Sequence, residues 1–201
     1  MTNPTLPLAW LDTMSRVRSV LPSAFLAGGA LRDLDNGREV KDLDVFFTEE
    51  AYNIAALEDG LAKQGYFYQS RCGGAYMTDA AGEVDGSTVY RSREGGPDLN
   101  LIQLTPGFNT AAIIDRVDFG LCQIGLDALG VVKTAAYDHD KANQRLTLTR
   151  ADSVEGVMRS IKRYNRLSQK YQGWEFYWLP HHDAIVEEAQ QRLKGAEVSL
   201  F

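Results

Sequence analysis

The segment spanning residues 25–46 restricts the fold of this chain more than any other stretch. A short apolar run at 24–27 has the composition of a buried strand, and it stops at the pair Gly28 and Gly29. Residues 30–34 then have the spacing of a short helix. The segment therefore predicts a buried strand joined to a helix by a tight glycine turn, an arrangement typical of proteins that mix helices with a sheet.

A second strand is predicted over residues 40–47, which carry Asp42 and Asp44. Side chains alternate along a strand, so both carboxylates lie on one face while Leu43 lies on the other. The two Cα atoms are then about 7 Å apart, at a rise of ~3.3 Å per residue. Carboxylate oxygens suit Mg²⁺, and two such ions about 3.5 to 4 Å apart can hold the attacking and leaving oxygens of a phosphoryl transfer.

The glycine turn has a separate chemical use. Gly28 and Gly29 lack side chains, so the backbone can adopt unusual dihedral angles and approach a ligand closely. Their N–H groups, together with the start of the following helix, can cradle a triphosphate. Arg32 and Lys41 carry positive charge that would neutralise the same phosphates.

Taken together, these residues resemble the head domain of CCA-adding tRNA nucleotidyltransferases and bacterial poly(A) polymerases, within the DNA polymerase β superfamily. That superfamily has a Gly-Gly or Gly-Ser turn, a strand with two acids separated by one residue, and a third acid on a later strand. The matching residues here are the runs FLAGGALRD at 25–33 and KDLDVF at 41–46, with Gly37 between them. This combination is far more specific than two spaced aspartates alone.

The resemblance implies a nucleotidyltransferase fold of the α/β (α+β) class, with a mixed central sheet flanked by helices and a short C-terminal helical segment. It also implies that Asp42 and Asp44 are the catalytic, metal-binding acids. The nucleotide-binding residues that it implies are Gly28, Gly29, Arg32 and Asp33, to which Lys41 is added for its charge. Taken singly, each residue has a structural alternative: solvated acids on an edge strand, an ordinary turn, or a surface ion pair.

Three residues compete for the position of the third acid. Asp98 is the predicted third metal ligand, and it shares one face of a strand predicted at 99–105 with Asn100. Asp118 fits an apolar-acidic-apolar pattern better but comes later in the chain. If Asn100 holds the position, a neutral amide replaces a charge and metal binding is weakened, so that a catalytically inactive relative is an alternative.

The rest of the first 150 residues mixes helical and extended patterns. Helices are predicted at 8–21, 51–64 and 110–116, and strands within 66–93 and at 99–105, 117–126 and 131–136. The turns of the hairpin region 66–93 are predicted at Gly73, Gly74, Gly82 and Gly86. We therefore predict a catalytic domain over residues 1–150, followed by a helical appendage over 151–201 that packs on it.

The appendage begins with an amphipathic helix predicted over residues 153–171. Asp152 and Glu155 have the spacing of a capping box at its start. Pro180 breaks the chain after an aromatic cluster, and a last helix is predicted over 183–194, capped by its first residue.

Basic residues form a stripe on the helix predicted over 153–171. The predicted nucleic-acid-binding residues are Arg159, Lys162, Arg163 and Arg166, with Lys170 on the same stripe. Such a stripe suits RNA or DNA phosphates, and the neighbouring Trp174, Tyr177 or Trp178 could stack on bases. The alternatives are a solvated face over a core helix, and aromatic side chains that fill that core.

Composition argues against several protein classes. The formal net charge of −6 does not suit a surface that is wholly a nucleic-acid footprint. Cys72 and Cys122 form no disulfide or zinc pattern, and His181 and His182 have no further ligand at suitable spacing. No apolar run of about 18 residues and no N-terminal signal pattern occurs, so we expect a cytoplasmic protein without a membrane partner.

The expected function is transfer of a nucleoside monophosphate from an NTP to a hydroxyl group, with Mg²⁺ or Mn²⁺ as cofactor. An RNA 3′ end, such as that of a tRNA, is the first choice of acceptor, although the short segment after the α/β portion argues against full tRNA maturation. One alternative is nucleotidylation of a small molecule or a protein, and another is an inactive nucleotide- or RNA-binding module. The preferred base and the oligomeric state stay open.

Overall fold

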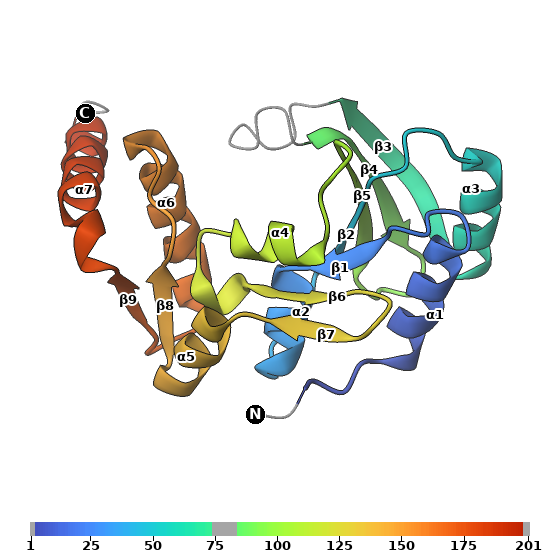
Figure 1. Ribbon diagram of the computed structural model, residues 1–201, viewed down its shortest axis with the longest axis horizontal. Helices are drawn as coiled ribbons and strands as arrows, with labels where there is room; N and C mark the ends of the chain where they lie inside the picture. Colours follow the sequence, from blue (N-terminus) through green and yellow to red (C-terminus); the bar gives the residue numbers. More distant parts are fainter. Residues whose placement is uncertain (1–2, 74–83, 199–201) are drawn as a thin grey trace. The chain divides into compact units, whose positions relative to one another are not determined.

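Short apolar strands assemble into a seven-stranded sheet with the order β3-β4-β5-β2-β1-β6-β7 (Figure 1). The strands are β1 Phe25–Ala27, β2 Asp42–Phe47, β3 Tyr66–Gly73, β4 Val84–Ser92, β5 Asp98–Leu104, β6 Ile124–Leu126 and β7 Val131–Lys133. The pair β2 and β5 is parallel, and the other neighbouring pairs are antiparallel. The helices that accompany them are α1 Leu8–Arg18, α2 Gly29–Asp35, α3 Ile54–Lys63 and α4 Thr110–Asp115. The mixed sheet flanked by helices confirms the predicted fold class.

The computed structural model describes residues 3–73 and 84–198. Two of the predicted turn glycines, Gly74 and Gly82, lie outside these ranges. Within these ranges, no helix is both long and apolar enough to cross a membrane.

The chain divides into two compact units, each described by itself. The sheet unit comprises Met1–Asp115 and Ile124–Lys133, and the helical unit comprises Arg116–Gln123 and Thr134–Phe201. The helical unit therefore takes in residues 134–150, which the sequence pattern assigned to the front of the chain. The boundary between catalytic domain and appendage at residue 150 stays a prediction.

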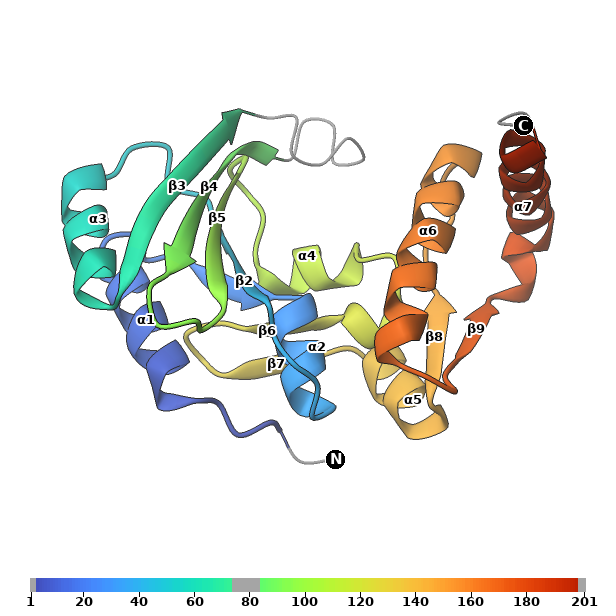
Figure 2. The same cartoon turned by 180° about the vertical axis from the view of Figure 1, so that it is seen from behind.

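The central strand β2 presents two chemically different faces, because its residues alternate between burial and exposure. Leu43, Val45 and Phe47 are buried, whereas Asp42 is exposed and Asp44 is half-buried. Helices α1 and α3 pack against each other and lie on the opposite side of the sheet from α4 (Figures 1 and 2). Burial of one β2 face fixes the orientation of both acids, since a shift of one residue would turn every side chain over.

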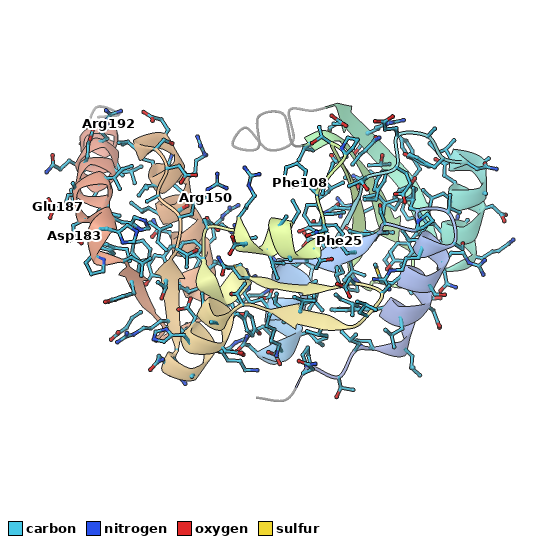
Figure 3. The ribbon with its side chains drawn as sticks, viewed as in Figure 1. Phe25, Phe108, Arg150, Asp183, Glu187 and Arg192 are labelled. Atoms are coloured by element: carbon cyan, nitrogen blue, oxygen red, sulfur yellow. The ribbon has the colours of Figure 1, made fainter. Side chains whose placement is uncertain are left out.

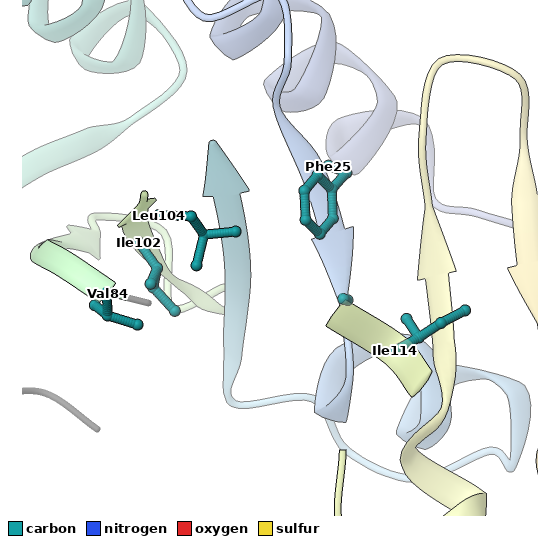
Figure 4. Close-up of a cluster of buried hydrophobic side chains, with 6 residues drawn as sticks. Phe25, Val84, Ile102, Leu104 and Ile114 are labelled. Carbon is teal, nitrogen blue, oxygen red and sulfur yellow. The ribbon is translucent and has the colours of Figure 1, made fainter. Parts of the chain in front are cut away.

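The acid-bearing face of the sheet is apolar at one end (Figure 4). The buried residues of this cluster are Phe25, Ala27, Val84, Ile102, Leu104 and Ile114, packed against Phe46, Phe108, Ile113 and Val132. Phe25 and Phe46 stack with ring centroids 5.6 Å apart across the antiparallel pair of β1 and β2. Apolar packing therefore ends where the acidic part of β2 begins.

The helical unit combines helices with a small parallel sheet (Figure 2). Its elements are η1 Gly120–Cys122, α5 Ala135–Asn143, β8 Arg145–Leu148, α6 Val154–Lys170, β9 Glu175–Trp178, η2 Pro180–His182 and α7 Asp183–Val198. Strands β8 and β9 pair in parallel, and α6 and α7 lie side by side. The two long helices confirm the helices predicted over 153–171 and 183–194.

Two predicted strands are wrong in part. The strand predicted over 117–126 is a 3₁₀ turn, η1, followed by the short strand β6. The strand predicted over 131–136 stops at Lys133, because the Thr134 side chain accepts a hydrogen bond from Tyr137 N and starts helix α5. The predicted capping box is also displaced by one residue: Ser153, not Asp152, accepts the hydrogen bond from Gly156 N at the start of α6.

Candidate active site on the central sheet

The two acids of β2 lie where the glycine turn leaves β1. The antiparallel register pairs Phe25 with Phe46 and Leu26 with Val45, so the end of β1 runs alongside the segment that carries Asp44. The next residue of β1 is Ala27, and the turn starts at Gly28. The sheet therefore brings the predicted metal-binding acids and the predicted phosphate-binding turn to one region.

Gly28 has a backbone conformation that L side chains rarely adopt, with φ +82° and ψ −125°. Its N–H donates to the Ile124 carbonyl at 2.9 Å, and its own carbonyl accepts from Arg32 N at 3.2 Å. Apart from its two chain neighbours, no atom of residues 3–73 and 84–198 lies within 4 Å of the position that a Cβ would take. A glycine is thus favoured by the dihedral angles rather than by lack of space, and nucleotide binding at Gly28 and Gly29 stays a prediction.

Arg32 and Asp33 form an ion pair within α2, with Arg32 Nε 2.7 Å from Asp33 Oδ1. Their exposed fractions are only 5% and 4%, so the alternative of a surface ion pair is wrong. An Arg32 Nη2 atom lies 3.6 Å from the position of a Cβ on Gly29, which places the guanidinium beside the turn. Burying a charged pair requires compensating partners, and a guanidinium held there suits an anionic group at the turn.

Two further charged residues border this region. Lys41 is exposed immediately before β2, and its carbonyl accepts from Asp98 N at 3.0 Å. Lys133 on β7 forms a buried salt bridge of 3.3 Å with Asp35 at the end of α2. The pair of Lys133 and Asp35 was not predictable from local patterns, because its members lie 98 positions apart along the chain. It anchors α2 to β7 and so helps to fix the turn that precedes that helix.

Strand β5 supplies the neighbours of the two acids. In the parallel register Asp98 is the Cα partner of Asp42, and Asn100 is the Cα partner of Asp44. Asn100 is 7% exposed, and its Nδ2 donates to Asp44 Oδ1 at 2.8 Å. The residue directly beside Asp44 is therefore an amide.

Asp98 forms its hydrogen bonds with β4. Its Oδ1 accepts from Ser92 N at 3.2 Å, and its Oδ2 forms an ion pair with Arg91. Within residues 3–73 and 84–198, no three His, Cys, Asp or Glu side chains are grouped so that they could hold a metal ion. The role of Asp98 as third metal ligand stays a prediction.

Asp118 belongs to the helical unit, where it is bound by α6. Arg163 Nη1 lies 2.6 Å from Asp118 Oδ1, and Ser160 Oγ donates to Asp118 Oδ2 at 2.9 Å. The residue after Asp118 in the apolar-acidic-apolar pattern, Phe119, is fully buried. This acid links the start of the unit to its longest helix.

Ser87 is a polar residue on the acid-bearing face that the sequence did not suggest. It is the Cα partner of Ile102 and is 3% exposed. Its hydroxyl has no hydrogen-bond partner among the residues that the structure describes. Because Ile102 and Asn100 share one face of β5, Ser87 adds an unsatisfied hydroxyl at the boundary between the acids and the apolar cluster.

The members of the basic stripe of α6 differ in their exposure to solvent. Arg159, Lys162 and Arg166 are exposed, whereas Arg163 is half-buried in its pair with Asp118. On the same helix Glu155 accepts from Arg192 of α7 at 2.9 Å, and Figure 3 shows Arg192 near the end of that helix. Three cations of the stripe therefore face solvent, and contact of all four with nucleic acid stays a prediction.

The aromatic residues after α6 mainly build the helical unit. Phe176 stacks on Tyr164 with centroids 4.7 Å apart and also contacts Trp178. Trp178 Nε1 donates to Asp183 Oδ1 at the start of α7 (Figure 3). Tyr177 is different, since it is 41% exposed with a guanidinium 5.0 Å from its ring centroid. Of the three predicted stacking residues, Tyr177 presents the most accessible ring.

Solved structures of similar fold include tRNA-processing, tRNA nucleotidyltransferase and CCA-adding enzymes. They include a tRNA-processing enzyme in an apo form, with 14% identity, a TM-score of 0.61, and coverage of 94% of this chain and 49% of that one. A tRNA nucleotidyltransferase complexed with a primer tRNA and an incoming ATP analog has 12% identity, a TM-score of 0.57, and coverage of 90% and 50%. The CCA-adding enzyme of Bacillus stearothermophilus in complex with CTP has 16% identity, a TM-score of 0.56, and coverage of 92% and 43%.

The chain spans about half the length of the structures that it matches. No protein-family model matches the sequence, and no curated protein is significantly similar to it. Identity at this level carries information about the fold alone. The resemblance noted in residues 25–46 is thereby confirmed at the level of architecture: the chain has the nucleotidyltransferase fold of the CCA-adding enzymes.

Proposed function

We propose that this protein transfers a nucleoside monophosphate from an NTP to a hydroxyl group, with Mg²⁺ or Mn²⁺ as cofactor. One observation carries the proposal: Asp42 and Asp44 share a face of β2 beside the Gly28 turn, which is followed by the buried pair of Arg32 and Asp33. Acids, a phosphate-accommodating backbone and a guanidinium are the groups that nucleotidyl transfer needs.

The chain's own residues account for binding and charge. Asp42 and Asp44 offer hard oxygen ligands on one face, so they would hold the divalent cation, which supplies positive charge to the phosphate oxygens when bound. The open side of Gly28 accommodates the triphosphate, with Arg32 and Lys41 as counter-charges. In the reaction an acceptor oxygen bonds to the α-phosphorus, the bond from that phosphorus to the bridging oxygen breaks, pyrophosphate leaves, and the hydroxyl proton passes to solvent.

An RNA 3′ end is the acceptor that we favour. The exposed cations Arg159, Lys162 and Arg166 suit a phosphate backbone, and Tyr177 offers a ring for stacking. Solved structures of the same fold hold a primer tRNA with an ATP analog, a tRNA, or CTP. A cytoplasmic location fits an RNA acceptor and belongs to the same proposal.

The test is incubation of the protein with each labelled NTP, Mg²⁺ or Mn²⁺, and total RNA. The double variant Asp42→Ala/Asp44→Ala should transfer about a thousandfold more slowly or worse. The bound cation lowers the activation free energy by several kcal/mol, and the variant loses its ligands. Asp12→Ala is the matched control, since this exposed aspartate of α1 lies outside the site and the variant should keep the wild-type rate.

The position of the label separates the acceptors. Label in RNA that disappears in the double variant supports the proposal. Label in protein or in small molecules indicates nucleotidylation of those acceptors, which would use the same two acids, Asp42 and Asp44. Binding of NTP without transfer to any acceptor would leave a nucleotide-binding module and would overturn the proposal.

A further inference from the structure

The parallel pairing of β2 and β5 determines which side chain stands next to the acids. Cα partners in a sheet project their side chains to the same face, so Asp42, Asp44, Asp98 and Asn100 all belong to one face. Of the two β5 residues, only Asn100 hydrogen-bonds to a β2 acid in the contacts described, with Nδ2 2.8 Å from Asp44 Oδ1. Asp98 is bonded instead to Arg91 and to Ser92 N on the other neighbouring strand.

The charge of the face follows from these contacts. Asp42, Asp44 and Asp98 bring carboxylates to this face, Arg91 pairs with Asp98, and Asn100 brings an uncharged amide. A buried amide in this position restricts the rotation of the Asp44 carboxylate through its hydrogen bond. It also leaves the site one charge below a three-acid arrangement, and ligand charge is a main determinant of affinity for hard cations.

We propose that Asn100 is a positioning residue that holds Asp44 for cation binding and takes the third ligand position of the acid site in place of a carboxylate. The inference rests on the proposed function for the identity of the site as a cation-binding one. Its consequence is that the protein alone binds a divalent cation weakly, and that the phosphates of the nucleotide complete the binding site. Cation and NTP therefore bind with strong mutual dependence.

The test is a titration of the protein with MnCl₂ in the absence of nucleotide and RNA. Electron paramagnetic resonance measures the free Mn²⁺ at each point of the titration. Asn100→Asp should bind Mn²⁺ about tenfold more tightly than wild type, because it adds a charged oxygen ligand. Asn100→Ala should bind about tenfold more weakly, because Asp44 loses the partner that orients it. The two substitutions act in opposite directions at one position.

Gln103→Glu is the matched control for the added charge. Gln103 lies on the same strand, but its Cα partner is Phe47, so it belongs to the opposite face. The substitution makes the same amide-to-acid change, and it should leave Mn²⁺ affinity near the wild-type value. An equal gain in Gln103→Glu would show that added charge, not position, is responsible, and it would overturn the assignment of Asn100.

A thermal-shift measurement gives a second readout. In EDTA Asn100→Asp should melt below wild type, because two carboxylates then face each other, and MnCl₂ should raise its melting temperature more than that of wild type. If Asn100→Asp does not fold, unchanged Mn²⁺ affinity in Asn100→Ala still contradicts the proposal. Neither measurement uses transfer activity, so a protein without transferase activity can confirm the role of Asn100, and an active one can refute it.

Discussion

The acids of the two units are held in different ways. Asp140 of α5 is 1% exposed and accepts hydrogen bonds from Leu121 N and Thr147 N, both at 2.9 Å, and from the Thr147 hydroxyl. Asp42 is exposed on β2, and Asp44 is half-buried beside one amide. The first acid is buried and accepts from three donors of the protein, whereas the β2 acids lie together on a face where one is exposed and the other half-buried. Enclosure by backbone donors marks an acid that builds the fold, and a shared, open face marks acids suited to a ligand.

Removal of Asp140 gives the largest expected difference in stability between the two kinds of acid. Asp140→Ala leaves three buried donors without their acceptor, so it should lower the free energy of unfolding by about 3 to 5 kcal/mol. Asp42→Ala, the matched change at an exposed acid, should stay within about 0.5 kcal/mol of wild type. Urea denaturation monitored by circular dichroism measures both. Similar losses in the two variants would mean that the β2 acids also serve the fold.

A smaller effect is expected at the glycine turn, where the sheet unit is constrained by its backbone rather than by its acids. Gly28→Ala forces an L side chain into a conformation with φ +82°, although the surrounding space is open. We expect a loss of about 1 to 3 kcal/mol in the free energy of unfolding.

Gly195→Ala in α7 is the control for that substitution. The position is helical and has open space around it, so alanine should add about 0.5 to 1 kcal/mol to the stability. A neutral outcome for Gly28→Ala in the same denaturation experiment would show that the turn relaxes easily.

The smallest expected effect on stability comes from His182, a buried histidine of the helical unit. Burial and the neighbouring His181 lower the pKa of His182 below its usual value of 6.5. The unfolded chain then binds the proton more readily than the folded protein, so the contribution of His182 to stability is present above pH 6.5 and is lost as the pH falls toward its folded pKa. Between pH 8 and pH 5 the denaturation midpoint should depend less on pH in His182→Gln than in wild type, and an unchanged pH dependence would contradict this prediction.

Local patterns were sufficient to predict the centre of the site. The alternation of Leu43, Val45 and Phe47 with Asp42 and Asp44 specifies a strand, the buried face and the side of the acids, and the structure has all three. Gly28 was predictable for a similar reason, since a glycine pair between a strand and a helix indicates a special backbone conformation. These features depend only on residues close together in the sequence.

Features that depend on distant residues were not predictable in this way. Asn100 was recognised as a competitor of Asp98, but only the parallel register with β2 shows which of them stands beside Asp44. Helix α5 was missed because its polar sequence has little apolar periodicity, and its anchoring depends on Asp140 reaching Leu121 across the unit. Thr134 caps this helix, but it lies within the segment 131–136 that was predicted to be a strand.

The parallel pairing of β2 and β5 has a consequence for how the protein folds. Helix α3 and strands β3 and β4 lie between these two strands in the sequence. The hydrogen bond between Asp44 and Asn100 therefore joins residues 56 positions apart. Contacts of such large sequence separation form slowly, because the entropy of loop closure must be overcome first. During synthesis the two acids and the glycine turn precede β5, which carries the amide that hydrogen-bonds to Asp44. We therefore expect the hydrogen bond between Asp44 and Asn100 to form only when β2 pairs with β5.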